Sequence, residues 1–476
     1  MNTSTITSSG ARLAKRRFRK LRFALIALGA FCFTVVIFYA EEDWRGKRAW
    51  ENCKHELEAK GAVLDWNKLI PPPVPDDQNF FKAPKMTEWF VKVAQTSTNE
   101  LTTQLSNAKT DTAGTATNAI TSATEARDYL TWSEQFEPDF NLIREALKRP
   151  YARMDGNYAI PSDAPVPNYI AVRAVARTLA QRAHCYLLLN QPEQALRELT
   201  LMHDMRRLLE AAPTGKPMTL VAAMINVAVN GLYVSTVADG FQKHTWQEPQ
   251  LITLQNQFAE MNPTPFVLEA FRMEQSAVNS YRPWVFMYNT TNLWQKLKSN
   301  GFWLFDVAPR GWTYQNMAVT TELYQKLWSS VDAPDYTISP RKIDAAVREV
   351  EGTLNSHSPY VLMGRTIIPN FGRAARLTAH NQTMANEAQL ACALERYHLA
   401  HGEYPEELDA LAPQFIKKIP HDIIGGQPLH YRRTDDGKFL LYSVGWNETD
   451  DGGQASTALD KWGNLDLGKG DWVWKD

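Results

Sequence analysis

Cysteine is scarce in this chain of 476 residues, which contains four of them. Cys32 lies in an apolar stretch, and Cys53, Cys185 and Cys392 are far apart, with no CxxC pair. This usage argues against a disulfide framework and against a cysteine zinc site. One disulfide among the last three cysteines stays open, and its pairing is not assigned.

The common catalytic and nucleotide-binding motifs are also missing. The chain has no GxSxG, no GxGxxG and no GxxxxGK[ST], because Thr214-Gly215-Lys216 lacks the upstream glycine. Its Asp, Glu and His residues follow no catalytic spacing. No reaction can therefore be read from the sequence, which leaves open only a site assembled in space.

Charge is absent from residues 23–40, FALIALGAFCFTVVIFYA, which as a helix would cover about 27 Å. The only charged residues before this run are basic: Arg12, Lys15, Arg16, Arg17, Arg19, Lys20 and Arg22. Three acids, Glu41, Glu42 and Asp43, follow it. Because basic flanks stay in the cytoplasm, we predict a basic cytoplasmic tail (1–22), one transmembrane helix (23–40) and a body on the far side of the membrane.

A cleaved signal peptide is the alternative interpretation. Cleavage needs small residues just before the cut, and Phe38 is bulky there. The apolar run is also longer than the usual signal-peptide core. We therefore expect an uncleaved membrane anchor.

The charge balance bears on the partners. Outside the tail, 44 basic residues stand against 52 acidic ones, a net charge of about −8. This balance argues against nucleic acid as a partner. Anionic inner-membrane lipid accounts for the basic tail.

Residues 41–128 are predicted to connect the anchor to the first domain. A juxtamembrane helix continues to Gly61, and Pro71, Pro72, Pro73 and Pro75 then favour an extended spacer. A ligand for a proline-binding module is the alternative to a spacer. Residues 95–126 are rich in Thr, Ser, Ala and Asn, which predicts a loose linker or a weak exposed helix.

Residues 129–370 are predicted to form a helical domain. Apolar periodicity indicates two helices joined at Asn190-Gln191, with Pro192 opening the second helix. This αα-hairpin resembles a single tetratricopeptide-like unit, although no 34-residue repeat recurs. A further helix is expected from Ser339-Pro340 to about Leu354.

Residues 217–238 form a second uncharged run, long enough to span a membrane. Asn226 and Asn230 lie one turn apart in its middle, where hydrocarbon would leave their amides without water. We therefore expect a core helix here, with a second membrane span as the alternative.

Large aromatic residues gather in 281–328, with Trp284, Trp294, Trp303, Trp312 and Trp328. Such a density lines ligand grooves or rests at a membrane interface. The simpler interpretation, which we favour, is a core filled with large rings.

Residues 371–476 are predicted to form a small α+β domain. A long helix runs from Gly372 to about His401, is stopped by Gly402, and is followed by a short helix opened by Pro405. The segments LHYRR and KFLLYSV read as strands joined by a turn at 434–437. The predicted fold is thus mainly α, with one transmembrane helix, a helical domain and this α+β ending.

This ending resembles the C-terminal domain of the major pseudopilin of type II secretion systems, over roughly the last fifth of the chain. The matching residues are Leu394, Tyr397, Gly402, Tyr404-Pro405, Leu408, Leu411, Ile419-Pro420, Asp422, Tyr431, Tyr442-Ser443 and Gly445. The middle of the chain resembles uncharacterised bacterial envelope proteins with this same ending. The chain departs from a pseudopilin by its long basic tail and by having no glutamate in the apolar segment.

The resemblance implies a calcium site, because the family binds calcium in the loop after YSxG. Calcium prefers six to eight oxygen ligands on a flexible loop. The candidate ligands here are Asn447, Asp450, Asp451, Asp460, Asp466 and Asp471. The alternative is a polar loop of turn-forming residues, which we weigh slightly higher.

His398 and His401 have the spacing of two metal ligands on a helix. No HExxH motif accompanies them, so we interpret them as solvated histidines that suit the helix C-terminus.

Two functions follow as hypotheses. The first is a non-enzymatic envelope protein that docks partners beside a type II secretion or pilus-like assembly, with calcium stabilising its ending. The resemblance implies that its anchor lies in a bacterial inner membrane and that its body is periplasmic. The second is an envelope hydrolase or ligand-binding protein with an aromatic cleft for a glycan or peptide.

Overall fold

The structure is a computed structural model that describes residues 6–92, 100–106, 120–210, 215, 218–280, 308–331, 335–461 and 463–474. It is mainly helical, with 65% helix, 6% strand and a small three-stranded sheet. The chain divides into two compact units. Unit 1 comprises Met1–Ala62, Tyr281–Leu323 and Thr353–Ile367, and unit 2 comprises Val63–Ser280, Tyr324–Gly352 and Ile368–Asp476.

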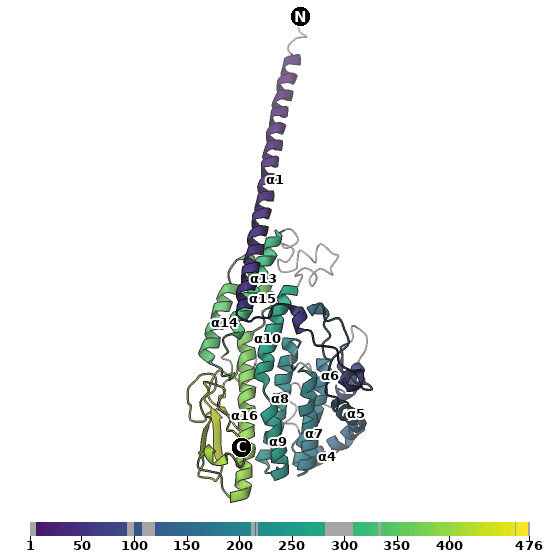
Figure 1. Ribbon diagram of the computed structural model, residues 1–476, viewed down its shortest axis with the longest axis vertical. Coiled ribbons are helices and arrows are strands. Elements are labelled where there is room, and N and C mark those ends of the chain that lie inside the picture. Colours follow the sequence, from purple (N-terminus) through teal and green to yellow (C-terminus); the bar gives the residue numbers. More distant parts are fainter. Residues whose placement is uncertain are drawn as a thin grey trace. The chain divides into compact units, whose positions relative to one another are not determined.

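One helix, α1 (Ile6–Ala59), carries the chain from the basic tail through the apolar run (Figure 1). Gly61, with φ of 86°, follows its end, as predicted. None of its apolar window is buried, and large side chains such as Phe31 and Val36 are exposed. Such an N-terminal apolar helix serves either as a membrane anchor or as a signal sequence.

Past the apolar run, α1 becomes part of the core of unit 1. Trp50, Cys53 and Leu57 are buried there. The other helices assigned at least partly to this unit are α13 (Arg310–Trp328), η7 (Pro359–Val361) and α15 (Leu362–Ile367). Unit 1 is therefore built around the juxtamembrane end of α1.

Glycine permits a backbone-to-backbone crossing of α1 and α13. A Cβ added at Gly46 would clash with the carbonyl oxygen of Gly311. A Cβ added at Gly311 would clash with the carbonyl oxygen of Glu42. Any larger residue at either position would force the two helices apart.

The helices of unit 2 pack side by side as a bundle (Figure 1). Its longer helices are α4 (Ala123–Ser133), α5 (Glu137–Leu147), α6 (Tyr169–Leu188), α7 (Pro192–Asp204), α8 (Leu220–Gln242), α9 (Glu248–Glu260), α10 (Pro263–Ser280), α14 (Pro340–Leu354) and α16 (Phe371–His401). The short helices are η1 (Trp66–Leu69), η2 (Asp76–Gln78), η3 (Phe80–Lys82), α2 (Met86–Phe90), α3 (Glu100–Ser106), η4 (Glu134–Phe136), η5 (Pro161–Asp163), η6 (Met205–Leu208) and η8 (Leu408–Leu411).

The predicted αα-hairpin is present as α6 and α7, which pack on each other. Asn190 adopts a positive φ of 55° in the connection, and Pro192 is the first residue of α7. The predicted inward residues Val175 and Met202 are fully buried. The tetratricopeptide likeness stays a prediction.

The second uncharged run forms α8, which packs against α6, α10 and α16. Both α1 and α8 are long and apolar enough to cross a membrane, but 61% of the apolar window of α8 is buried. Asn230 donates to Asn226, which donates to Glu210, 2.9 and 3.3 Å away. This is the arrangement expected of a core helix.

The connecting segment is more deeply packed than the sequence suggested. Phe80, Phe81 and Phe90 are buried in the core of unit 2, although we expected the domain to start near Tyr129. In the predicted loose linker, α3 packs on α6 and buries Leu101 and Leu105. The correction has a simple cause, because the few apolar residues of this stretch share one helical face.

At the C-terminal end, α16 packs on one side against α8, α9 and α10 and on the other against the sheet. The sheet has the order β1-β2-β3, all antiparallel, with β1 (His430–Arg433), β2 (Phe439–Ser443) and β3 (Trp472–Val473). The helix ends at Gly402 (φ 82°), and the hairpin turns at Gly437 (φ 79°), as predicted. Residues 371–476 therefore share one compact unit with most of the helical domain.

Candidate functional site

The loop between β2 and β3 holds the six predicted calcium ligands, and Asp471 is the buried one among them. Its carboxylate accepts backbone N–H bonds from Asp451 (3.1 and 3.2 Å) and Gly453 (2.7 Å). Burial raises the pKa of Asp471, the two N–H donors lower it, and the charges of Asp450 and Asp451 raise it again. A cation here would relieve this repulsion between carboxylates.

Three other predicted ligands lie beside Asp471. Asn447 donates to Asp451, with 2.9 Å between Nδ2 and Oδ2. Asp450 accepts from Tyr442 (3.0 Å) and from Gly452 N–H (2.8 Å), and the Gly452 bond is the main reason that its pKa is lowered. The structure thus brings Asn447, Asp450, Asp451 and Asp471 into one cluster.

Asp460 and Asp466 stand apart in turns of their own. Asp460 accepts from Asn464 N–H at 2.9 Å, and Asp466 accepts from Gly468 N–H at 3.0 Å. Asp466 also lies 3.6 Å from the Lys469 ammonium. These contacts are those of turn-forming residues, the alternative interpretation of the loop.

The described residues contain no group of three or more His, Cys, Asp or Glu side chains placed to hold one metal ion. Calcium also binds amide and backbone carbonyl oxygens, which these four residue types do not include. The calcium site therefore stays a prediction, with four of its six residues in one place.

The two helix-end histidines differ in their surroundings. His401 is exposed and stacks on Tyr397, with 4.1 Å between ring centroids. His398 stacks on Tyr404 at 4.6 Å. Each ring thus has an aromatic partner of its own, and the described residues show no shared metal site there.

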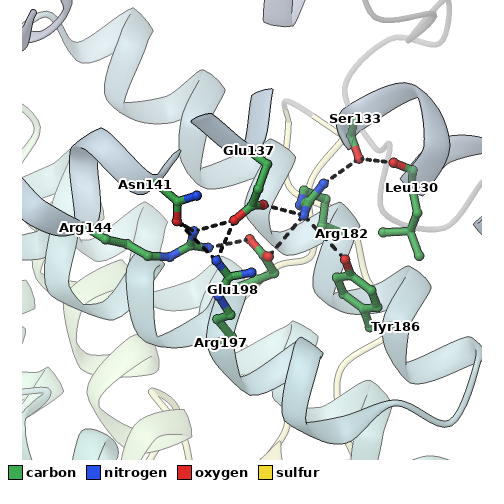
Figure 2. Close-up of polar contacts among 9 residues, drawn as sticks. All are labelled: Leu130, Ser133, Glu137, Asn141, Arg144, Arg182, Tyr186, Arg197 and Glu198. Carbon is green, nitrogen blue, oxygen red and sulfur yellow. Dashed lines mark hydrogen bonds and ion pairs between the residues drawn. The ribbon is translucent and has the colours of Figure 1, made fainter. Parts of the chain in front are cut away.

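A charged cluster that sequence reasoning missed lies among α4 to α7 (Figure 2). Arg182, 1% exposed, donates to Ser133 (2.8 Å), Glu137 (2.9 Å) and Glu198 (3.2 Å). Arg144 donates to the same two glutamates, and Arg197 donates to Glu137. These residues come from four helices and have no common spacing, so the sequence offered no signal.

This cluster is suited to holding helices together. Burial raises the pKa of Glu198, while the guanidinium groups of Arg182 and Arg144 lower it. Because arginines occupy both carboxylates, neither is available as a general acid or base. We therefore regard the cluster as structural.

One cavity in unit 2 has a volume of about 20 Å³. Its lining residues are mostly apolar and include Met154, Tyr158, Leu208 and Met218. One water needs roughly 10–15 Å³ and ligand pockets have roughly 300–1,000 Å³, so this space does not fit a glycan or peptide.

The aromatic-rich segment 281–328, for which we favoured a filled core over a ligand groove, is only partly within the described residues, and Trp284, Trp294 and Trp303 lie outside them. Trp312 meets Tyr360 edge-on in unit 1, at 6.2 Å between centroids. Trp328 donates to Gln275 at 3.0 Å in unit 2 and lies under Arg272. Both described tryptophans thus pack against neighbours within their own units.

All four cysteines are unpaired, and Cys53, Cys185 and Cys392 are buried. The disulfide that the sequence left open is therefore not formed in this structure.

Comparison with known proteins identified no relative of this chain. No family model, no curated protein and no solved structure matches this chain. The functional argument therefore depends on the chain's own geometry.

Proposed function

We propose that this protein is a single-span, non-enzymatic protein of the bacterial inner membrane. Its tail faces the cytoplasm, and its body is a periplasmic docking module beside a type II secretion or pilus-like assembly. The observation that carries the proposal is the change of environment along α1. Side chains from Phe23 to Phe38 are exposed, whereas Trp50, Cys53 and Leu57 on the same helix are packed.

An exposed apolar face this long has a high free-energy cost in water. Burying a leucine-sized side chain contributes about 1.5–3 kcal/mol of free energy, which a fully exposed side chain does not gain. Many such side chains follow one another in this run. The seven basic residues before the run suit anionic headgroups. A bilayer therefore satisfies both the apolar run and the charges at its cytoplasmic end.

The anchor is tested by charge insertion. Leu28→Arg with Val35→Arg puts two charges in the apolar run, each costing about 2.5–3.5 kcal/mol at the centre of a span. We expect this variant to leave the membrane fraction after an alkaline wash. The matched control, Val63→Arg with Ile252→Arg, alters exposed apolar residues of unit 2 and should remain bound.

The orientation is tested with compartment reporters fused to Met1 and to Asp476. We expect a cytoplasmic signal at Met1 and a periplasmic signal at Asp476. A cytoplasmic signal at Asp476 would contradict the single span and would revive α8 as a second one.

The docking role and the calcium site need separate experiments. Crosslinking in intact membranes, followed by affinity capture, should recover an envelope or secretion-system protein. A photocrosslinker at the exposed Leu459 should give that product, and one at the exposed Ile252 of α9 should not, if the contact lies in 371–476. For calcium, thermal unfolding is compared with and without a chelator. Binding would stabilise the folded state, so an unchanged midpoint rejects the site.

A further inference from the structure

Glu387 is the most anomalous charged residue in the described part of the chain. It lies on α16 and is completely buried. The described residues show no side-chain hydrogen bond and no ion pair to either carboxylate oxygen, and the backbone N–H of Ser443 is the one donor that acts on this group. A lone buried carboxylate is strongly disfavoured, so Glu387 needs either a counter-charge or a proton.

The group that faces Glu387 is a second buried acid. Asp422, 2% exposed, lies in the 421–428 turn and acts on Glu387 electrostatically. Its Oδ1 accepts the N–H of Ile424 at 2.9 Å. Ser443 of β2 connects the two acids. Its hydroxyl donates a hydrogen bond to Asp422, its backbone N–H interacts with Glu387, and each interaction lowers the pKa of the acid concerned.

The neighbouring titratable groups do not neutralise this pair. His430 on β1 has an electrostatic effect that lowers the pKa of Asp422. Its Nδ1 lies 3.5 Å from Oδ2 of Asp450. His380, also on α16, meets Trp472 of β3 edge-on, and burial lowers its pKa to about 4, so it is neutral. Asp471, next to β3, is held by its own backbone donors. No described lysine or arginine acts on Glu387.

The turn that carries Asp422 joins three elements. Asn386 of α16 donates to the carbonyl of His421 at 3.2 Å. The segment before α14 pairs with the turn through Ile338 N–H to Ile423 (2.8 Å) and Gly425 N–H to Ile338 (3.1 Å). A movement of Asp422 away from α16 would therefore loosen the attachment of α14 as well.

We propose that Glu387 and Asp422 share one proton, and that its loss to water releases the 421–428 turn from α16. The pair is a pH-sensitive latch. Two like charges in the interior repel each other, and the turn is the element that can carry one of them to solvent.

The direction of the pH effect follows from the buried state. Burial raises the pKa of Asp422 to about 6, and burial together with Asp422 raises the pKa of Glu387 well above its ordinary value. The folded chain therefore binds more protons than the unfolded chain. Its stability falls as pH rises through these values, and the latch is closed on the acidic side.

The test uses the full chain in detergent and measures amide hydrogen exchange, corrected for the intrinsic rate. From about pH 6 to about pH 9, we expect protection of residues 421–428 and 338–343 to fall by about tenfold or more. Glu387→Gln should keep protection constant within about twofold over the same range. A wild type without this fall, or a variant that shows the same fall, overturns the proposal.

The matched control is Glu395→Gln, on the same helix. Glu395 is 9% exposed but has a partner, since Tyr404 donates to it at 2.7 Å. This variant should retain the pH dependence of the 421–428 turn. Loss of the pH dependence in this control would also overturn the assignment to Glu387.

Infrared spectroscopy gives a second readout that needs no opening of the turn. Near neutral pH the wild type should show the carbonyl band of a protonated buried carboxyl group, and Glu387→Gln should lack it. Absence of this band in the wild type, or its loss on adding calcium, would show that a cation rather than a proton holds the pair.

Discussion

At the scale of single residues, the acids after the apolar run have a second role besides marking the membrane boundary. Asp43 accepts the backbone N–H of Gly311 at 2.7 Å and so caps the N-terminus of α13. Glu42 is 4% exposed and accepts from Tyr360 at 3.1 Å. Carboxylates suit a helix N-terminus, because its first N–H groups lack partners.

Loss of this cap should weaken unit 1. Asp43→Ala should lower the free energy of unfolding by about 1 kcal/mol, because an N–H is left without its acceptor. Asp43→Asn keeps the accepting oxygen and should cost less than half of that. Hydrogen exchange of the first turn of α13 reports the difference, and equal exchange in both variants would count against a capping role.

Replacing Arg182 should lower the free energy of unfolding by more than loss of the Asp43 cap does. Arg182→Met keeps much of the side-chain volume but leaves Glu137 and Glu198 without their buried partner, which should cost about 3–5 kcal/mol. Arg197→Ala changes a half-exposed member of the same cluster and should cost no more than about 1 kcal/mol. Urea unfolding in detergent measures both. Similar costs for the two variants would mean that burial does not set the strength of this cluster.

At the scale of elements, the α1–α13 crossing depends on two glycines. Gly46→Ala and Gly311→Ala each place a methyl group on a backbone oxygen, so both should destabilise unit 1 by about 1–3 kcal/mol. Gly352→Ala, on α14, meets nothing within 4 Å and should stabilise by about 0.5–1 kcal/mol. Thermal unfolding compares the three variants, and a stabilised Gly46→Ala protein would refute the crossing.

At the scale of the whole molecule, α16 belongs to two packing arrangements at once. Ala388, Ala391 and Leu394 belong to one continuous core that holds residues of α6 to α9 and also Phe439 and Leu441 of β2. The C-terminal α+β element and the helical bundle therefore share a helix. They should unfold together, because neither can keep its core without it.

A truncated chain tests this dependence. A protein ending at Ile367 loses α16, and we expect it to lack a protease-resistant helical core, although α6 to α9 are all present. The full chain, treated identically, should retain one. A truncated protein with the same resistant fragment would show that residues 371–476 form a separate domain.

Several features could be predicted from local sequence. The ends of α1, α14 and α16, the hairpin at Asn190, and the β1–β2 turn follow from glycine, proline and caps acting within a few residues. In the predicted calcium-binding loop, Asn447, Asp450 and Asp451 are close in sequence and lie together, whereas Asp471 joins their cluster from next to β3 by accepting the N–H groups of Asp451 and Gly453. Asp460 and Asp466 do not lie with them, because each makes hydrogen bonds within its own turn.

The sequence by itself determined where the chain is helical, where it turns and which stretch is too apolar for water. These are properties of neighbouring residues, and periodicity reports them directly. Only the tertiary structure decided the partners of Arg182, the cap that Asp43 provides and the meeting of Glu387 with Asp422. Each joins residues far apart in the chain, and burial, which gives these charges their effect, exists only after the helices have packed.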